Sequence, residues 1–149
     1  MNSIVFDNVN QKKLKVFAEK IAYIVVPGDV LLLEGPLGAG KTYFAAEFCK
    51  FLDVKTIVNS PSYVLLNEYE GKYKIFHYDL YRLSSPEEAF ELGILDNISN
   101  SISIIEWPQL IEPYIKKDKI HIKLNFMSDY QKNQDKRNVE LFSTRLLNL

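Results

Sequence analysis

Apolar and polar positions follow different periods along this chain, and the first clear period is that of a helix. After Asn10, apolar residues recur three and four positions apart, with lysines and Glu19 between them. This spacing predicts an amphipathic helix with Asn10 as its N-cap, ended by the turn residues Pro27-Gly28-Asp29. Residues 4–6, before this helix, predict a short strand. The apolar positions of the helix are Leu14, Phe17, Ala18, Ile21 and Ala22.

The next apolar run has no such period. Val30-Leu31-Leu32-Leu33-Glu34 does not alternate between apolar and polar side chains. A continuous run of this length is typical of a strand that is buried on both faces. A glycine-rich segment follows at once, and residues 42–51 then have helical character without Gly or Pro.

Further strands and a short helix are predicted after residue 53. Residues 63–69 and 73–78 flank Glu70-Gly71-Lys72, which is typical of a β-hairpin in which Gly71 supplies a positive φ. Ser84-Ser85-Pro86-Glu87-Glu88 predicts the start of a helix and Gly93 its end. The other predicted strands are residues 54–58, residues 101–105 and the alternating Ile120, Ile122 and Leu124. Residues 125–138 resemble a polar loop, and periodicity does not decide between strand and helix for residues 139–149.

These elements together predict the fold class. Buried strands, intervening helices and one hairpin indicate a single α/β domain, residues 1–149, built on a mixed β-sheet flanked by helices. A length of 149 residues fits one domain, because two would each be too small for a good core. A hydrophobic content of 47% with 25% charged residues is that of a globular chain rather than a disordered one.

Charge and cysteine content narrow the function classes. The formal net charge of -1 argues against a protein that binds nucleic acid by its own electrostatic field. Basic residues gather at positions 116–119 and 132–137, as solvated loops or as a contact surface for RNA or an RNA-binding partner. The single cysteine, Cys49, has no internal disulfide partner and is expected in the core. Because neither a secretory signal nor a membrane-length apolar run is visible, we expect a protein of the reducing cytoplasm.

The glycine-rich segment carries the strongest chemical signal. Gly35-Pro36-Leu37-Gly38-Ala39-Gly40-Lys41-Thr42 fits the pattern G-x-x-x-x-G-K-[ST] between a buried strand and a helix, which predicts a phosphate loop, or P-loop. Its backbone N–H groups and the start of the helix suit a polyphosphate. Lys41 can reach the β- and γ-phosphates, and the Thr42 hydroxyl can bind Mg²⁺. Since the guanine-reading run Asn-Lys-x-Asp is absent, we expect ATP as the nucleotide.

Two acidic residues are candidates to complete this site. Glu106 follows the strand 102–105, which should lie beside the strand of the P-loop, so its carboxylate is expected to hold the metal ion. If residues 76–83 continue as a strand, His77, Asp79 and Tyr81 share one face. Asp79 could then bind Mg²⁺ or orient the attacking water. A purely structural hydrogen-bonded cluster is the alternative.

Three other positions allow two interpretations each. Ser60-Pro61-Ser62-Tyr63 is either a turn or a loop that responds to the γ-phosphate, as switch loops do. Trp107 is either a core residue or an aromatic side chain against the nucleotide or a partner. His121, on an alternating strand, is expected to be a surface histidine or one with satisfied hydrogen bonds.

Taken together, these motifs resemble the bacterial TsaE (YjeE) family, the ATPase component of the machinery that makes N6-threonylcarbamoyladenosine (t6A) in tRNA. They occur in the family's order and spacing from about residue 28 to residue 110. The segments that carry the resemblance are Leu33 to Thr42, Ser60-Pro61-Ser62-Tyr63, His77-Tyr78-Asp79-Leu80-Tyr81-Arg82-Leu83, Glu91-Leu92-Gly93 and Ile105-Glu106-Trp107-Pro108.

The resemblance implies a P-loop NTPase fold and a role for each site residue. Thr42 and Glu106 would hold Mg²⁺, and Asp79 would be needed for hydrolysis together with Lys41. Residues 60–62 would form the switch-like loop, and Trp107 would lie near the nucleotide. Two positions depart from the family pattern. Ser62 replaces the usual threonine but keeps a hydroxyl, whereas Tyr43 replaces a small hydroxyl residue expected near the α-phosphate.

The resemblance also implies partners: a TsaD-type protein, which transfers the carbamoyl group to tRNA, and its TsaB-type companion. Contact with tRNA would then be indirect, through the complex. The chain has only three arginines and none is an obvious arginine finger, so we expect slow ATP hydrolysis by the protein alone. A small-molecule kinase and a nucleotide-gated binding module without hydrolysis are the alternative functions.

Overall fold

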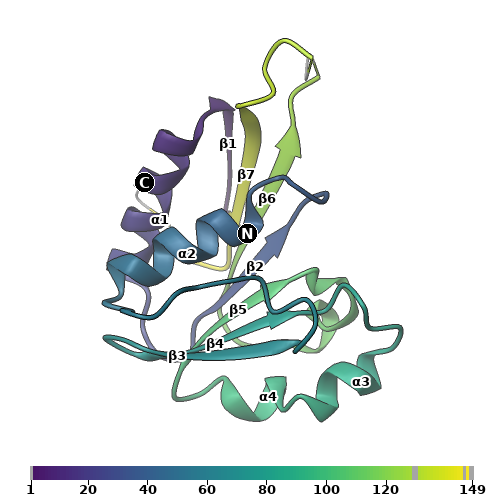
Figure 1. The fold of residues 1–149 in the computed structure, drawn as a ribbon. Coiled ribbons are helices and arrows are strands. Elements are labelled where there is room, and N and C mark those ends of the chain that lie inside the picture. The colour runs from purple at the N-terminus through teal and green to yellow at the C-terminus, as the bar shows by residue number, and fades with distance from the viewer. Residues whose placement is uncertain (1, 129–130, 146, 148–149) are drawn as a thin grey trace.

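A mixed β-sheet runs through the molecule, with helices on both faces (Figure 1). The computed structural model describes residues 2–128, 131–145 and 147. The strand order across the sheet is β1-β7-β6-β2-β5-β4-β3. The strands are β1 (Asn2–Val9), β2 (Val30–Glu34), β3 (Leu66–Glu70), β4 (Lys74–Asp79), β5 (Ile102–Glu106), β6 (Lys119–Phe126) and β7 (Arg137–Ser143). The helices are α1 (Gln11–Ile24), α2 (Lys41–Phe51), α3 (Pro86–Glu91) and α4 (Ile94–Asn97), with two 3₁₀ turns, η1 (Pro108–Leu110) and η2 (Glu112–Tyr114).

The centre of the sheet is parallel and its edges are antiparallel. β2 pairs in parallel with β5 and β6, and β4 pairs in parallel with β5. The hairpin β3–β4 forms one edge, and β7 and β1 extend the sheet beyond β6 in antiparallel pairing. Because parallel strands point the same way, the carboxyl ends of β2, β4 and β5 lie side by side. The candidate site lies at these strand ends.

Two hydrophobic cores lie on opposite faces of the sheet. α1 and α2 cover one face, where Leu31 and Leu33 of β2 point into the larger core. α3 and α4 cover the other face, where Val30 and Leu32 point into the second core. Both sides of β2 are therefore buried, which explains why its sequence does not alternate. Cys49 of α2 is fully buried in the larger core, as predicted.

The helix boundaries confirm the local signals in the sequence. The side chain of Asn10 accepts a hydrogen bond from Lys13 N at 2.9 Å, and Ser85 accepts one from Glu88 N at 3.4 Å. Pro86 is the first residue of α3, and Gly93, just beyond it, has a left-handed φ of 77°. Among the described residues, no helix is long and apolar enough to cross a membrane.

The strand predicted at residues 54–58 is wrong. This segment belongs to a connection that runs to β3, which begins at Leu66 rather than at residue 63. Val54 packs into the larger core, but Ile57 is 83% exposed. The seven strands of the sheet do not include residues 54–58, and the hairpin β3–β4 is what extends the sheet beyond β5. The β-branched residues of this segment have a high β-strand propensity, but tertiary structure outweighs it and the segment forms a loop.

Gly71 lies in the predicted hairpin, but the reason given for it is wrong. Its φ is not positive. A Cβ at this position would lie 2.2 Å from the carbonyl oxygen of Leu52, and Lys72 N donates to that same oxygen at 2.6 Å. The hairpin turn therefore needs glycine because the backbone after α2 approaches it closely.

Both ends of the chain contribute more sheet than the sequence predicts. β1 spans eight residues instead of the three expected, with an irregularity between Phe6 and Val9. The undecided C-terminal region contains β7, which begins at Arg137 inside the segment predicted as loop. Residues 146, 148 and 149 of that region lie outside the described residues.

Candidate functional site

The predicted P-loop connects the end of β2 to the start of α2. Its three glycines, Gly35, Gly38 and Gly40, have φ values of 155°, 77° and 112°, which few other residues adopt. A Cβ on Gly35 would also lie 2.3 Å from the carbonyl oxygen of Leu124 in β6. The loop is therefore held against the neighbouring strand in a conformation that only glycine permits. Its position at the amino end of an 11-residue helix favours a bound anion.

Lys41 is the basic group of this loop. Its Nζ donates to the carbonyl oxygens of Gly35 at 2.6 Å and Pro36 at 3.0 Å, and lies 4.2 Å from the ring centroid of Trp107. Burial lowers the pKa of this ammonium, and the carboxylates of Glu106 and Asp79 partly oppose that shift. An ammonium held by two carbonyl oxygens and a ring face can exchange these partners for phosphate oxygens.

Thr42 and Glu106 meet beside Lys41. The Thr42 hydroxyl lies 3.2 Å and 3.4 Å from the two carboxylate oxygens of Glu106. Glu106 ends β5, is 2% exposed, and is the register partner of Leu33 in β2 and of Asp79 in β4. A hydroxyl and carboxylates are hard oxygen donors, and Mg²⁺ in nucleotide sites is commonly held by one or two carboxylates together with phosphates. These residues therefore fit the predicted magnesium ion.

Asp79 lies at the end of β4, next to Glu106. Its Oδ2 accepts hydrogen bonds from the hydroxyls of Ser60 at 3.0 Å and Ser62 at 3.1 Å, and its Oδ1 accepts one from Tyr81 N at 3.0 Å. The predicted switch segment is thus tied directly to a candidate catalytic carboxylate. Asp79 therefore belongs to a hydrogen-bonded cluster, and that cluster faces the P-loop. A role for Asp79 in metal binding or hydrolysis stays a prediction.

His77 supports the same carboxylate from the interior. It is fully buried, and its Nε2 lies 2.6 Å from Glu106 Oε2. Its Nδ1 lies 3.0 Å from the hydroxyl of Tyr69 in β3. The sequence singled out His77, but it gave no sign of Tyr69. These two residues fix one oxygen of Glu106 while the other remains near Thr42.

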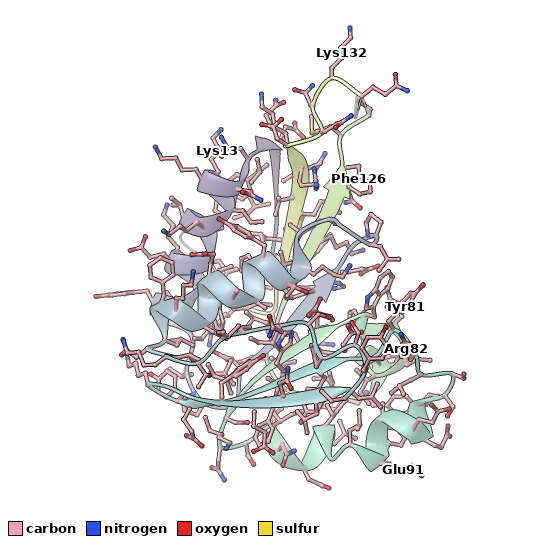
Figure 2. The ribbon with its side chains drawn as sticks, viewed as in Figure 1. Lys13, Tyr81, Arg82, Glu91, Phe126 and Lys132 are labelled. Atoms are coloured by element: carbon pink, nitrogen blue, oxygen red, sulfur yellow. The ribbon has the colours of Figure 1, made fainter. Side chains whose placement is uncertain are left out.

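The aromatic residues of the site lie beyond Lys41. Trp107 has a left-handed φ of 57° and packs against the second core, and its ring lies 4.8 Å from that of Tyr81 at a tilt of 45°. Figure 2 shows Tyr81 and Arg82 together at the margin of the molecule, in the connection after β4. The Arg82 guanidinium lies 4.4 Å from the ring of Tyr63. Trp107 therefore packs on the second core with one part of its surface and lines the site with another.

A cleft of about 350 Å³ joins these groups and is called here the P-loop cleft. Gly35, Pro36 and Ala39, also predicted to contact nucleotide, lie within the loop and outside the lining. Gln11, at the start of α1, lines the cleft but was missed by the sequence analysis. The lining residues are Gln11, Leu37, Gly38, Gly40, Lys41, Thr42, Tyr43, Ser60, Ser62, Asp79, Tyr81, Glu106 and Trp107.

Two basic side chains that were not assigned to the site, His121 and Arg137, differ in their positions. His121 is held by Glu34 at 2.7 Å and by Glu112 at 3.4 Å, so its ring nitrogens are satisfied, as predicted. Arg137, one of the clustered basic residues, is not a solvated side chain. Its guanidinium donates to the carbonyl oxygens of Gly38 and Ala39 in the P-loop.

Comparison with known proteins identifies the family of this chain. The family model for "Threonylcarbamoyl adenosine biosynthesis protein TsaE" matches residues 9–138. A "tRNA threonylcarbamoyladenosine biosynthesis protein TsaE" from Rickettsia felis is 38% identical over 122 residues, which are 80% of this chain and 71% of that protein. The protein of the same name from Bacillus subtilis is 34% identical over 131 residues, 87% of this chain and 82% of that one.

The fold is similar to a solved structure as well. The crystal structure of Bacillus subtilis YdiB superposes with a TM-score of 0.74 at 29% sequence identity, covering 97% of this chain and 87% of that one. The family match includes the P-loop, the switch segment and both strand-end carboxylates, and the structural match extends over both edges of the sheet. The chain therefore belongs to the TsaE family of threonylcarbamoyl adenosine biosynthesis proteins.

Proposed function

We propose that this protein binds ATP with Mg²⁺ in the P-loop cleft, hydrolyses it slowly, and thereby supports t6A modification of tRNA. One observation carries the proposal. Lys41, Thr42, Asp79 and Glu106 come from two strand ends and one helix start, and all four line a single cleft. This is the set of groups that nucleoside triphosphate hydrolysis requires: a cation for phosphate, oxygen ligands for a metal, and a carboxylate for water.

Each residue has a separate task in the proposal. Lys41 leaves the carbonyl oxygens of Gly35 and Pro36 and binds the β- and γ-phosphate oxygens. Thr42 and Glu106 hold Mg²⁺, which supplies charge neutralisation at the phosphates when it is bound. Asp79 accepts hydrogen bonds in the structure, so its carboxylate can equally accept one from a water molecule placed for in-line attack on the γ-phosphate.

The positions of the three arginines lead us to expect slow hydrolysis. Arg137 is held by backbone carbonyl oxygens, Arg145 is paired with Asp29 at 2.6 Å, and Arg82 lies on the ring of Tyr63. None of the three lines the P-loop cleft. Without an arginine finger, phosphoryl transfer lacks a group that contributes about 10³–10⁵ in rate. We therefore expect turnover that is slow until partners bind.

The proposed partners are the TsaD-type and TsaB-type proteins of the same pathway. The relatives are named for tRNA threonylcarbamoyladenosine biosynthesis, and a net charge of -1 suits a protein that reaches tRNA through a complex. Because tRNA modification takes place where tRNA is, the proposal places the protein in the cytoplasm. ATP would hold the loop of Ser60 and Ser62 in one conformation, and hydrolysis would release it.

Calorimetry tests both halves of the proposal. The purified protein should bind ATP in the presence of Mg²⁺, and the TsaD–TsaB pair should bind the ATP form more tightly than the ADP form, since a population shift requires differential affinity. Absence of binding to any purine triphosphate would overturn the nucleotide half. Equal partner affinity in both nucleotide states would overturn the switching half. Rapid ATP turnover by the protein alone would contradict the proposed need for partners.

A further inference from the structure

Arg137, at the start of β7, spans two successive carbonyl oxygens of the P-loop. Its Nε donates to Ala39 O at 3.0 Å and its Nη2 donates to Gly38 O at 3.2 Å. A guanidinium is planar and presents its N–H groups in a rigid fork, so two bonds from one side chain fix the direction of both carbonyl groups. These carbonyl groups belong to the loop that the proposed function assigns to phosphate.

The direction of the two carbonyl groups sets the direction of the amides that follow them. In a planar trans peptide the C=O of one residue and the N–H of the next point in opposite directions, and the described residues contain no cis peptide bond. The carbonyl groups of Gly38 and Ala39 face the guanidinium, so the N–H groups of Ala39 and Gly40 point away from it. Ala39 N donates to Pro36 O at 3.1 Å, across the loop. Successive backbone N–H groups on one side of a turn form the concave nest that binds an anion.

The tip of the P-loop is open to solvent. Leu37 is 65% exposed, and a Cβ added to Gly38 would meet no atom within 4 Å beyond its chain neighbours. Gly38 and Gly40 have left-handed φ values, and glycine loses more conformational freedom on folding than any other residue. A loop of this kind needs directional contacts to stay in one conformation. The two hydrogen bonds from Arg137 supply such contacts.

The side chain of Arg137 is itself held from several directions. In the sheet, Arg137 pairs with Val9 of β1 on one side and with Phe126 of β6 on the other. The centroid of the Phe126 ring lies 4.8 Å from the guanidinium carbon. Nη1 donates to Gln134 O at 2.7 Å and to Lys136 O at 2.9 Å. The guanidinium is thus a fixed support that connects β7 and the β6–β7 connection to the P-loop.

We propose that Arg137 is a positioning residue, which holds the P-loop in its phosphate-binding conformation before the nucleotide arrives. Arg137 does not line the P-loop cleft, so it acts through the backbone of the loop rather than on the phosphates. The inference rests on the proposed nucleotide binding. It adds that β7 and the β6–β7 connection, and not only β2 and α2, set the geometry of the phosphate site.

Hydrogen exchange of the nucleotide-free protein tests the support directly. Arg137→Met keeps an apolar stem but removes all the donors of the guanidinium. The amide of Ala39, which donates to Pro36 O, should then exchange about tenfold faster than in the wild type, since each of the two lost hydrogen bonds contributes roughly a factor of three. The amide of Ile122, in the middle of β6, should keep its wild-type rate. NMR measures the single amides, and a thermal melt checks that the variant is folded.

Affinity for two phosphate ligands tests the consequence. Mg²⁺-ATP and Mg²⁺-tripolyphosphate share the phosphate chain, so a residue that orders the loop should affect both. Arg137→Met should lose about tenfold in affinity for each ligand, which leaves the ratio of the two affinities at its wild-type value. Calorimetry measures these affinities in both proteins.

Lys132→Met is the matched control. It removes one positive charge from an exposed position of the same connection, and the structure gives Lys132 no hydrogen bond to the P-loop among the residues that it describes. Because an exposed charge at that distance is screened by salt, both affinities should change by less than about twofold.

Phe126→Leu provides a second test if the methionine variant does not fold. It keeps the donors of Arg137 but removes the ring that covers the guanidinium. The exchange rate of the Ala39 amide should rise by a smaller factor, about two- to fivefold. An unchanged rate in this variant would count against a fixed guanidinium as the support of the loop.

The outcomes separate the inference from the proposed function. An unchanged exchange rate at Ala39 in a folded Arg137→Met protein overturns the inference, whatever the nucleotide data show. Equal losses of affinity in Arg137→Met and Lys132→Met would mean that charge alone matters, and would overturn it too, as would a loss confined to ATP. If the wild type binds neither ligand, the proposed function fails and the exchange rates alone decide the inference. Faster exchange at Ala39 with parallel losses for both ligands supports it.

Discussion

The carboxylate of Glu106 lies 2.6 Å from Nε2 of His77, and this contact is fully buried. The same carboxylate also lies near the Thr42 hydroxyl, so it contacts both a buried histidine and a residue that lines the P-loop cleft. On the other side of the imidazole, the hydroxyl of Tyr69 lies 3.0 Å from Nδ1 of His77. A proposed metal ligand is thus oriented by a histidine, and that histidine is in turn oriented by a tyrosine.

This arrangement predicts that His77 and Tyr69 control the requirement for Mg²⁺. Outer residues that orient metal ligands typically contribute 10- to 100-fold in metal affinity or activity. We expect His77→Gln to raise the Mg²⁺ concentration needed for half-maximal ATP binding by about that factor, and Tyr69→Phe to raise it less. Titration of Mg²⁺ at fixed ATP measures this. Nucleotide affinity in the absence of Mg²⁺ should stay near the wild-type value.

The matched control for these variants is Tyr73→Phe, which removes a tyrosine hydroxyl from the same hairpin away from His77. It should leave the Mg²⁺ requirement unchanged. A His77→Gln protein that folds, as judged by its thermal melt, and needs no additional Mg²⁺ would show that His77 only fills space in the core.

Lys41 and Asp79 should separate binding from chemistry. Lys41→Ala removes charge-assisted hydrogen bonds to the phosphates, so ATP affinity should fall by about 10- to 100-fold. Asp79→Asn keeps the size of the side chain but removes its charge, so the hydrolysis rate should fall by about 100-fold or more with little change in affinity. Calorimetry and single-turnover phosphate release measure the two effects. Equal losses of affinity in both variants would contradict the division of roles.

The parts of the site that could be predicted are those set by the order of elements along the chain. A glycine-rich segment after a buried strand predicts a P-loop. Parallel strands bring their carboxyl ends together, which predicts that Asp79 and Glu106 approach the same loop. The structure confirms the placement, because the two residues are register partners in β4 and β5. Their roles in metal binding and hydrolysis stay predictions.

The parts that could not be predicted depend on register and on distant contacts. Tyr69 reaches His77 because Asn67 pairs with His77 across the hairpin, which places Tyr69 diagonally opposite the histidine. Arg137 reaches the P-loop from 98 positions away in the sequence. In the sequence alone, Tyr69 resembles an aromatic residue of a hairpin, and Arg137 resembles a cation in a loop. Both assignments needed the three-dimensional arrangement of strands.

The loop of Ser60 and Ser62 offers a further prediction. Both hydroxyls donate to Asp79, and the neighbouring Tyr63 is 84% exposed, so chymotrypsin can cleave there. Removing both hydrogen bonds in Ser60→Ala/Ser62→Ala costs about 0.5–1.5 kcal/mol for each bond, which should raise the cleavage rate at Tyr63 several-fold. Timed digestion with mass spectrometry measures this rate. Ser99→Ala, at an exposed serine outside the loop, is the control.

If the double alanine variant is cleaved no faster than the wild type, the serines do not hold the loop. ATP with Mg²⁺ should slow cleavage of the wild type if the nucleotide orders the segment, as the proposed switch requires. The same addition should protect the double variant less, because its loop has lost two of its connections to the site.

The burial of Cys49 makes the free energy of unfolding depend on pH. Burial raises the pKa of its thiol to about 12, from a model-peptide value of 9.0, because the thiolate cannot be solvated inside the larger core. Above pH 9 the unfolded chain therefore loses this proton while the folded protein keeps it. The contribution to stability is complete below pH 9 and is lost as the pH rises toward 12, with a slope of about 1.4 kcal/mol per pH unit.

This sign predicts that Cys49→Ala reduces the loss of stability at alkaline pH. Urea unfolding at pH 8 and pH 10 should show a smaller decrease in the free energy of unfolding for the variant than for the wild type, by about 1 kcal/mol. The buried Tyr78 also has a raised pKa, but it remains in both proteins and cancels in the comparison. Tyr69 does not cancel fully, because the charge of Cys49 is one of the causes that raise its pKa, and losing that cause changes the variant in the same direction. The native thiol should also resist alkylation at pH 8 until urea unfolds the protein. Rapid alkylation in native buffer would mean that α2 opens locally and that the buried thiol does not set the pH dependence.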